Sequence, residues 1–378
     1  MARNSYKINK HQISDKPSRK NGNEDKYFSE TGSETKIPYQ SPMKISLTEK
    51  ELIEGILSQD RIVLAQSITM AESSNTNHQA IIQKVLNSIL PKSGKSVRIG
   101  ITGSPGVGKS SLIEVFGNFL CGIGHKVAVL AIDPSSSRSG GSILGDKTRM
   151  ESLSQNSNAF IRPSPSSGIL GGVAKSTREC IFLCEAAGFD IIIIETIGVG
   201  QSEITARSMT DFMILLLMPD AGDELQGIKK GSVELADLII VNKADNGNIE
   251  KAQITAKQYA QALHYIEPAT LGWRTRTITA SALENKGIET IWESIQNFIK
   301  ITRDNSSFDK RRSLQSVDWF TSLLKETIIS DFFNSGKIVN KFNELKEKIL
   351  NEKINPTSAV SNILNYYRKQ NETTHRNK

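Results

Sequence analysis

Short apolar runs recur along the middle of the chain, separated by stretches in which hydrophobic residues follow helical spacing. Near-continuous apolar runs of this length are typical of parallel strands that are buried on both faces, and the helical stretches are typical of the connections between such strands. We therefore expect an α/β fold with a mostly parallel sheet. The expected strands are residues 99–102, 126–132, 189–194, 212–218, 236–241 and 277–279.

The two ends of the chain follow different patterns from the middle. Residues 1–45 are polar and lack periodicity, so we expect a disordered tail. Residues 46–92 predict a helical N-terminal extension, with Ser46 to Glu49 as the capping sequence of its first helix. Residues 93–302 then hold the α/β domain.

The region beyond Ser313 is wholly helical in pattern. We expect a helical extension over residues 313–366 and a basic tail over residues 367–378. Its apolar positions form one stripe of Val317, Phe320, Leu323, Leu324, Ile328 and Phe332, and a second of Ile338, Phe342, Leu345 and Ile349. Such stripes either pack against the parent domain or form a dimer interface, and the sequence leaves both open.

Composition and charge narrow the choice of partners. In the 378 residues, no apolar run approaches the length of about 18 needed to cross a bilayer, so we expect no membrane partner. The net charge of +7 is concentrated at the ends, where residues 1–44 hold nine Lys or Arg against five Asp or Glu. Solvated basic tails account for such a charge, so we expect no nucleic acid.

The cysteines and the N-terminal sequence bear on the compartment. The three cysteines lack metal-site spacing, and reduced thiols are the expected state. The N-terminal residues have no apolar core of a secretory signal and include acidic residues, unlike a transit peptide. We therefore expect a cytoplasmic protein.

A glycine-rich loop follows the first expected strand and precedes an apolar helix. It matches the phosphate-binding pattern G-x-x-x-x-G-K-[ST], in which backbone N–H groups surround a phosphate chain. Lys109 is expected to reach the β and γ phosphates, and the Ser110 hydroxyl to bind Mg²⁺. The expected phosphate-binding residues are Gly103, Ser104, Pro105, Gly106, Val107, Gly108, Lys109, Ser110 and Ser111.

Acidic residues end two further strands, where a parallel sheet binds its ligands. Asp133 follows residues 126–132. It is expected to hold Mg²⁺ through water or to polarise the attacking water, and the alternative is that it caps a helix or turn. Glu195 ends residues 189–194 and is expected near Mg²⁺, directly or through water. Asp146, in a Gly- and Ser-rich loop over residues 135–150, is a further candidate for the metal shell.

Three charged or glycine-containing loops are candidate switches that respond to the γ-phosphate. Arg149 belongs to the first loop, Gly198 and Gln201 to the second, and Asp223 and Lys229 to the third. Gly198 is expected to donate its N–H to the γ-phosphate, and Gln201 is a candidate for orienting the attacking water. A plain solvated loop would have a similar composition.

The motif N-K-x-D, formed by Asn242, Lys243 and Asp245, follows the strand at residues 236–241. A carboxylate at Asp245 can accept hydrogen bonds from both guanine N–H groups, whereas adenine leaves it facing a lone pair, so GTP is the expected nucleotide. Asn242 is expected to tie this loop to the phosphate loop, and the Lys243 stem to cover the base. Ser281, Ala282 and Leu283 follow the last strand and are expected to contact the guanine carbonyl.

Taken together, the motifs resemble one family, the MeaB/ArgK group of methylmalonyl-CoA mutase-associated GTPases in the SIMIBI class of P-loop proteins. The resemblance rests on GSPGVGKSS, DPSSSRSGGSILGDKTRM, ETIGVGQSE, PDAGDELQGIKKG and NKAD in this order. It implies a P-loop NTPase domain with helical extensions and candidate roles by position. The implied catalytic residues are Lys109, Asp133, Glu195 and Lys229, the metal shell is Ser110, Asp133, Asp146 and Glu195, and the switches hold Arg149, Gly198, Gln201 and Asp223.

The resemblance also implies a biological role. Members of the group are homodimeric G-protein chaperones that gate cofactor loading of an adenosylcobalamin-dependent acyl-CoA mutase and protect it from inactivation. It implies GTP or GDP with Mg²⁺ on this chain, and no cobalamin bound by the chain itself. The alternatives are a metal-insertion GTPase of the hydrogenase or urease type, against which the few histidines count, and a nucleotide-sensing module without turnover. A small-molecule kinase would need an acceptor site, which the sequence does not show.

Overall fold

The computed structural model describes residues 47–132, 150–164, 170–196, 201–219 and 230–376. These residues belong to one compact unit that spans Ser46–Lys378. Within the described ranges, no helix has both the length and the apolar character required to cross a membrane.

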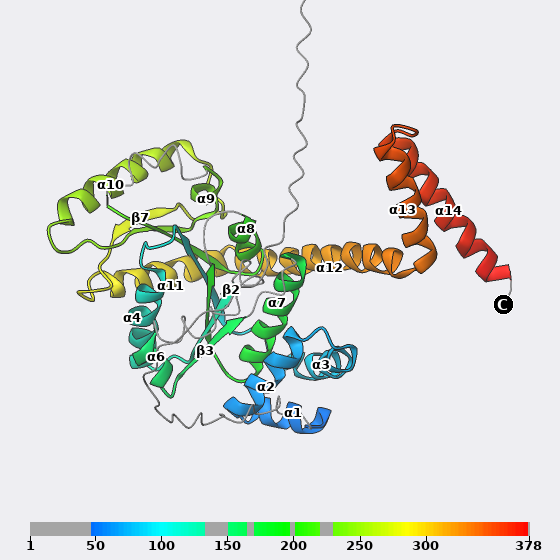
Figure 1. The fold of residues 1–378 in the computed structure, drawn as a ribbon. Coiled ribbons are helices and arrows are strands. Elements are labelled where there is room, and N and C mark those ends of the chain that lie inside the picture. The colour runs from blue at the N-terminus through cyan, green and yellow to red at the C-terminus, as the bar shows by residue number, and fades with distance from the viewer. Residues whose placement is uncertain (1–46, 133–149, 165–169, 197–200, 220–229, 377–378) are drawn as a thin grey trace, which may run out of the picture. The chain divides into compact units, whose positions relative to one another are not determined.

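A parallel sheet lies at the centre of the described residues (Figure 1). Its seven strands have the order β3-β2-β4-β1-β5-β6-β7, and every neighbouring pair runs parallel. The strands are β1 (Val97–Gly103), β2 (Val127–Ile132), β3 (Ala159–Ser164), β4 (Ile191–Thr196), β5 (Phe212–Leu217), β6 (Leu238–Val241) and β7 (Arg276–Thr279). The predicted α/β fold with a mostly parallel sheet is confirmed.

The strand β3 is an addition to the six that the apolar runs predict. Arg162 and Pro163 interrupt its apolar pattern, so the sequence carries little strand signal there. Proline cannot donate to a neighbouring strand, and β3 tolerates it because it lies at the edge of the sheet, with β2 as its partner.

Helices cover both faces of the sheet because the strands are apolar on both sides. Alternate strand residues such as Ile99, Ile193 and Ile214 share one core with Phe116 of α4 and Phe298 of α11. The opposite side of β5 and β6 packs against α9 and α10 in a second core. The domain helices are α4 (Lys109–Gly122), α6 (Glu151–Gln155), α7 (Leu170–Ala186), α8 (Gln201–Arg207), α9 (Lys230–Leu235), α10 (Ile249–Ala262) and α11 (Ile288–Asp304), with a 3-10 turn at Leu263–Tyr265.

Three N-terminal helices, α1 (Glu49–Leu57), α2 (Arg61–Glu72) and α3 (Thr76–Ile89), precede a 3-10 turn at Leu90–Lys92 and contact α7. The predicted cap from Ser46 to Glu49 is wrong. Thr48 caps α1 instead, and its reciprocal partner is Glu51. Both pairs fit the same four-residue spacing, and the observed helix start buries Leu52 and Ile56.

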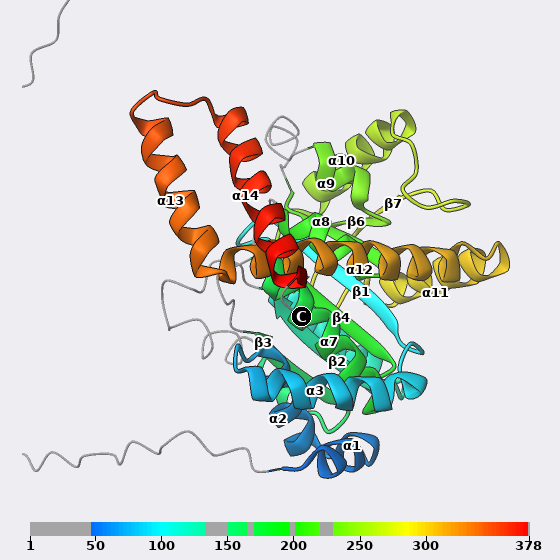
Figure 2. The ribbon, with the colours of Figure 1, turned by 90° about the vertical axis from the view of Figure 1, so that its right-hand side faces the viewer.

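The C-terminal region contains α12 (Ser307–Asn334), α13 (Gly336–Leu350) and α14 (Pro356–Arg376), shown in orange to red in Figure 2. The helix α12 begins before the expected boundary at Ser313. In the second apolar stripe, Ile338 and Leu345 pack with α14 in a small core. In the first stripe, Val317 and Phe320 are 59% and 65% exposed, so they do not pack against the parent domain.

Candidate nucleotide-binding site

The loop from β1 to α4 has the backbone that phosphate binding requires. Gly106 and Gly108 have φ angles of 81° and 94°, which residues with a Cβ rarely adopt. A Cβ on Gly108 would also lie 2.6 Å from the Asn242 side chain. Among the described residues, no side chain caps the start of α4, so its first N–H groups remain for an anion.

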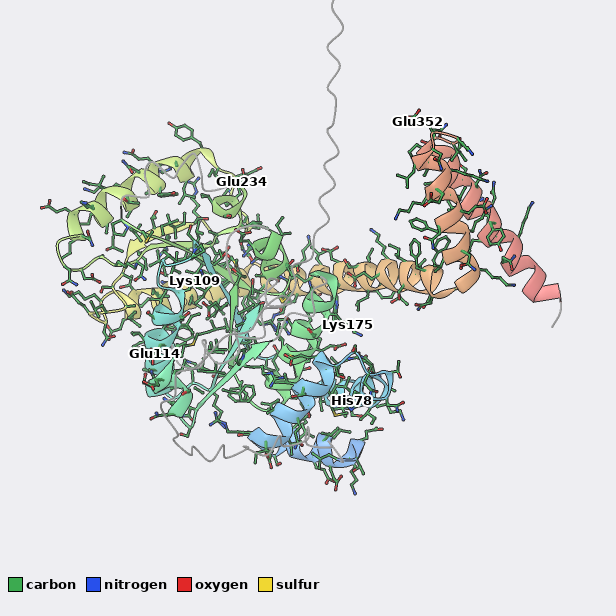
Figure 3. All side chains as sticks on the ribbon, viewed as in Figure 1. His78, Lys109, Glu114, Lys175, Glu234 and Glu352 are labelled. Atoms are coloured by element: carbon green, nitrogen blue, oxygen red, sulfur yellow. The ribbon has the colours of Figure 1, made fainter. Side chains whose placement is uncertain are left out.

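Lys109 is held inside this loop at the start of α4 (Figure 3). Its Nζ donates to the carbonyl oxygens of Gly103 at 2.7 Å and Ser104 at 3.1 Å. Burial lowers the pKa of the Lys109 ammonium, and the nearby Glu195 carboxylate opposes that shift. The loop therefore holds the lysine within reach of any phosphate that the N–H groups bind.

Two oxygen ligands that suit magnesium lie next to the loop. The Ser110 hydroxyl donates to Glu195 Oε1 at 3.2 Å, and Glu195 is buried at the end of β4. The pairing of β1 with β4 sets Glu195 beside Ile101, close to the phosphate loop. Hydroxyl and carboxylate oxygens are ligands that Mg²⁺ prefers, so the residues present fit the metal.

A pair of threonines that the sequence analysis did not single out supports this arrangement. Thr196 Oγ1 donates to Thr102 Oγ1 at 2.9 Å, and both side chains are buried. The bond joins the ends of β4 and β1 at the position where Glu195 meets the loop. A threonine at a strand end is common, so the sequence carried no signal for the pair.

The N-K-x-D segment contacts the phosphate loop directly. Asn242 is buried, and its Nδ2 donates to the Val107 carbonyl oxygen at 2.9 Å. Lys243 has a φ of 60°, and its Nζ donates to the Gly106 carbonyl oxygen at 2.8 Å. The contact predicted for Asn242 is present, and Lys243 adds a second one.

The segment after β7 contacts the N-K-x-D segment. Ser281 is fully buried, and its hydroxyl donates to Asp245 Oδ2. The Ala282 N–H donates to Asn242 Oδ1 at 3.4 Å, whereas the Leu283 side chain is 75% exposed. A cleft of about 980 Å³ opens beside Ala282 and Leu283, with α4 as its other wall. The structure thus brings the two predicted base-binding segments together.

Several candidate residues are not part of this geometry. Those outside the described residues are Asp133, Asp146, Arg149, Gly198, Asp223 and Lys229. Gln201 begins α8, but its side chain also lies outside the described set. The described residues of the candidate site are therefore the phosphate loop, Glu195 and the two segments predicted to bind the base.

Comparison with known proteins finds GTPases that are similar to this chain. The family "Methylmalonyl Co-A mutase-associated GTPase MeaB" matches residues 64–337. A "Putative GTPase" of Caulobacter vibrioides is 45% identical over 85% of this chain and 97% of its own length. The mouse protein "Methylmalonic aciduria type A homolog, mitochondrial" is 39% identical over 84% of this chain and 79% of its own.

A solved structure shows the same fold. The crystal structure of a "LAO/AO transport system kinase" has a TM-score of 0.69 and 35% identity, over 85% of this chain and 97% of that protein. Because the family match spans most of the chain and the relatives align over most of their length, the chain belongs to the methylmalonyl-CoA mutase-associated GTPase (MeaB) family.

Proposed function

We propose that this GTPase is a chaperone for an adenosylcobalamin-dependent mutase, either methylmalonyl-CoA mutase or a related acyl-CoA mutase. In this proposal it gates loading of the mutase cofactor and protects the mutase from inactivation. The name of the family and the printed name of the mouse relative support the choice of partner. The observation that carries the nucleotide part is the hydrogen bond between Asn242 and Val107, which joins the base-reading and phosphate-binding segments.

Phosphate binding falls to the β1–α4 loop. Backbone N–H groups and Lys109 would hold the β and γ phosphates, with the lysine turning from the Gly103 and Ser104 carbonyl oxygens toward them. Ser110 and Glu195 would hold Mg²⁺, with Asp133 and Asp146 as further candidates. When bound, this ion neutralises the charge that develops on the phosphates during hydrolysis.

Selection of guanine falls to Asp245. The Ser281 hydroxyl occupies one of its oxygen atoms and orients the carboxylate. The carboxylate would accept from the ring N1–H and the exocyclic amine of guanine. Ala282 and Leu283 would face the guanine carbonyl, and the Lys243 stem would lie against the base.

The switch role belongs to loops that carry Arg149, Gly198, Gln201, Asp223 and Lys229. The described helices support a link between two of these loops, since α8 directly follows residues 197–200 and α9 directly follows residues 220–229. Ser232 of α9 donates to Glu203 of α8 at 2.9 Å, and both side chains are buried. A conformational change in one loop would therefore be transmitted to the helix that follows the other loop.

A homodimer accounts for the exposed stripe of α12. Phe320 and Ile328 are 65% and 57% exposed, although both are large apolar residues on one helix. Contiguous exposed apolar surface marks an interaction site, and a second copy of the chain would bury it.

The three cysteines are free thiols, which supports a reducing compartment such as the cytoplasm.

The test is the rate of GTP hydrolysis by the full chain in Mg²⁺, alone and with a cobalamin-dependent mutase from the same source. ATP is the parallel control, and Lys109→Ala controls for contaminating activity. We expect slow GTP turnover that rises with the mutase and no ATP turnover. GTP turnover that does not change when the mutase is added would support the GTPase activity and refute the proposed partner.

A further inference from the structure

A small cavity outside the nucleotide site is lined by three arginines. It has a volume of about 20 Å³ and lies where α7 meets the first part of α12. Arg98 of β1, Arg178 of α7 and Arg312 of α12 line it, together with Gln315 and Trp319. The two helices cross in Figure 1 and meet here, since Arg178 donates to the Gln315 carbonyl oxygen at 3.1 Å.

Two of the three arginines have carboxylate partners. Arg98 Nε and Nη2 donate to the two oxygen atoms of Glu185 at 2.9 and 3.1 Å. Arg312 Nε and Nη2 donate to the two oxygen atoms of Asp211 at 2.8 and 2.6 Å. These two bidentate pairs are electrically neutral, and the guanidinium groups remain at the cavity wall.

Arg178 is buried, with only 9% of its surface exposed, and yet it has no carboxylate hydrogen-bond partner among the described residues. Its hydrogen bonds go to neutral groups, the Ser208 carbonyl oxygen at 2.7 Å, the Ser208 hydroxyl at 2.8 Å and the Gln315 carbonyl oxygen. Burial and the neighbouring Arg98 lower the pKa of Arg178 to about 10, against a weaker opposing effect of Asp318. At this wall the Arg178 guanidinium therefore carries a positive charge that is not hydrogen-bonded to any carboxylate of the described residues, although Asp318 lies near enough to act on it.

Two N–H groups of cavity-lining residues also lack acceptors. Arg178 Nε and Trp319 Nε1 are buried, and neither has a hydrogen-bond partner within the described residues. Gln315 Oε1 is likewise unpartnered, with its amide fixed by Nε2 donating to the carbonyl oxygens of Arg207 and Thr210. That oxygen carries a partial charge, which is small beside the full charge of Arg178. Buried donors without acceptors are costly, so an acceptor is expected in the cavity.

The size and lining of the cavity define that acceptor. A volume of about 20 Å³ slightly exceeds the roughly 10–15 Å³ that one water-sized occupant needs, which suits a single monatomic ion. Phe182, Met209 and the Trp319 ring supply apolar walls, which favour a weakly hydrated ion. We propose that this cavity binds one monovalent anion of halide size, with chloride as the physiological ion.

The bound anion would connect α7 of the α/β domain to the first part of α12, where the C-terminal helical region begins. It would accept from Arg178 on α7 and Trp319 on α12, and would give the Arg178 guanidinium a directly bonded negative partner. The site is separate from the nucleotide pocket, so its occupancy can be tested without GTP.

Crystals of the full chain grown or soaked in bromide provide the direct test, because bromide scatters anomalously and substitutes for chloride. We expect a bromide peak in this cavity. In solution, we expect chloride to raise the unfolding temperature saturably relative to gluconate at equal ionic strength. The proposal would be overturned if the crystals contain water in the cavity at high bromide concentration. It would also be overturned if a bromide peak is present but chloride does not raise the unfolding temperature more than gluconate does.

Variants connect the effect to the cavity. Arg178→Met removes the guanidinium charge from the cavity wall and should abolish the chloride effect. Trp319→Phe keeps an aromatic ring but removes one donor, so chloride affinity should fall about tenfold or more. Arg274→Met, the same replacement at an exposed arginine, should respond like the wild-type protein. An unchanged chloride response in Trp319→Phe would refute the site even if Arg178→Met fails to fold.

Discussion

Replacing Asn242 by alanine tests the link between the two halves of the nucleotide site. The change removes the 2.9 Å bond from Nδ2 to the Val107 carbonyl oxygen and the 3.4 Å bond from the Ala282 N–H to Oδ1. The first is a bond between buried atoms, so the variant leaves a buried carbonyl oxygen without its donor. Such an orphaned group costs about 1–3 kcal/mol.

We expect most of this cost to appear in nucleotide binding. GDP must contact the phosphate loop and the base-reading segment at once, and without Asn242 the ligand has to order the two segments itself. A loss of about 1–3 kcal/mol corresponds to GDP binding weakened about 5- to 150-fold. Titration with a fluorescent GDP analogue measures the dissociation constant, and thermal unfolding without nucleotide separates this effect from global instability.

A matched control comes from the C-terminal extension. Asn351 Nδ2 also donates to a backbone carbonyl oxygen, that of Glu347 at 2.8 Å, but the residue is exposed and far along the chain from the site. Asn351→Ala should therefore leave GDP binding unchanged. If Asn242→Ala binds GDP within twofold of the wild-type protein, the argument that this bond organises the site is refuted.

Three further changes test separate parts of the proposal. Lys109→Ala should abolish productive GTP binding because it removes the phosphate-directed ammonium, and unchanged affinity with unchanged turnover would show that the loop binds no phosphate. Asp245→Asn should shift preference toward xanthine nucleotides, since the amide offers a donor where the carboxylate accepts; the ratio of XDP to GDP affinity measures this, and strict guanine selectivity would contradict it. Phe320→Glu, at a 65% exposed position of α12, should convert a dimer to monomers in light scattering with GDP binding intact, whereas a persistent dimer would place the interface elsewhere.

The fold class and the described segments of the candidate nucleotide site could be predicted because their signals are local. A strand buried on both faces needs a run of apolar residues, and a phosphate loop needs glycines and a lysine at fixed spacing. The order of the expected strands along the chain was therefore readable. The edge strand β3 was not, since Pro163 weakens its pattern and an edge position makes that proline acceptable.

By itself the sequence determined six of the seven strands, the helical segments and the two nucleotide motifs, since hydrophobic periodicity and turn chemistry act between near neighbours. Only the tertiary structure decided the strand order and the pairs that span long stretches of chain. Asn242 meets Val107 across 135 residues, and Arg178 meets Gln315 across 137. It also decided that Val317, Phe320 and Ile328 of the α12 stripe are exposed, while Ile338 and Leu345 of the next stripe are buried. The physical reason is that packing selects which apolar faces meet, and a periodic pattern shows that a face exists without specifying its partner.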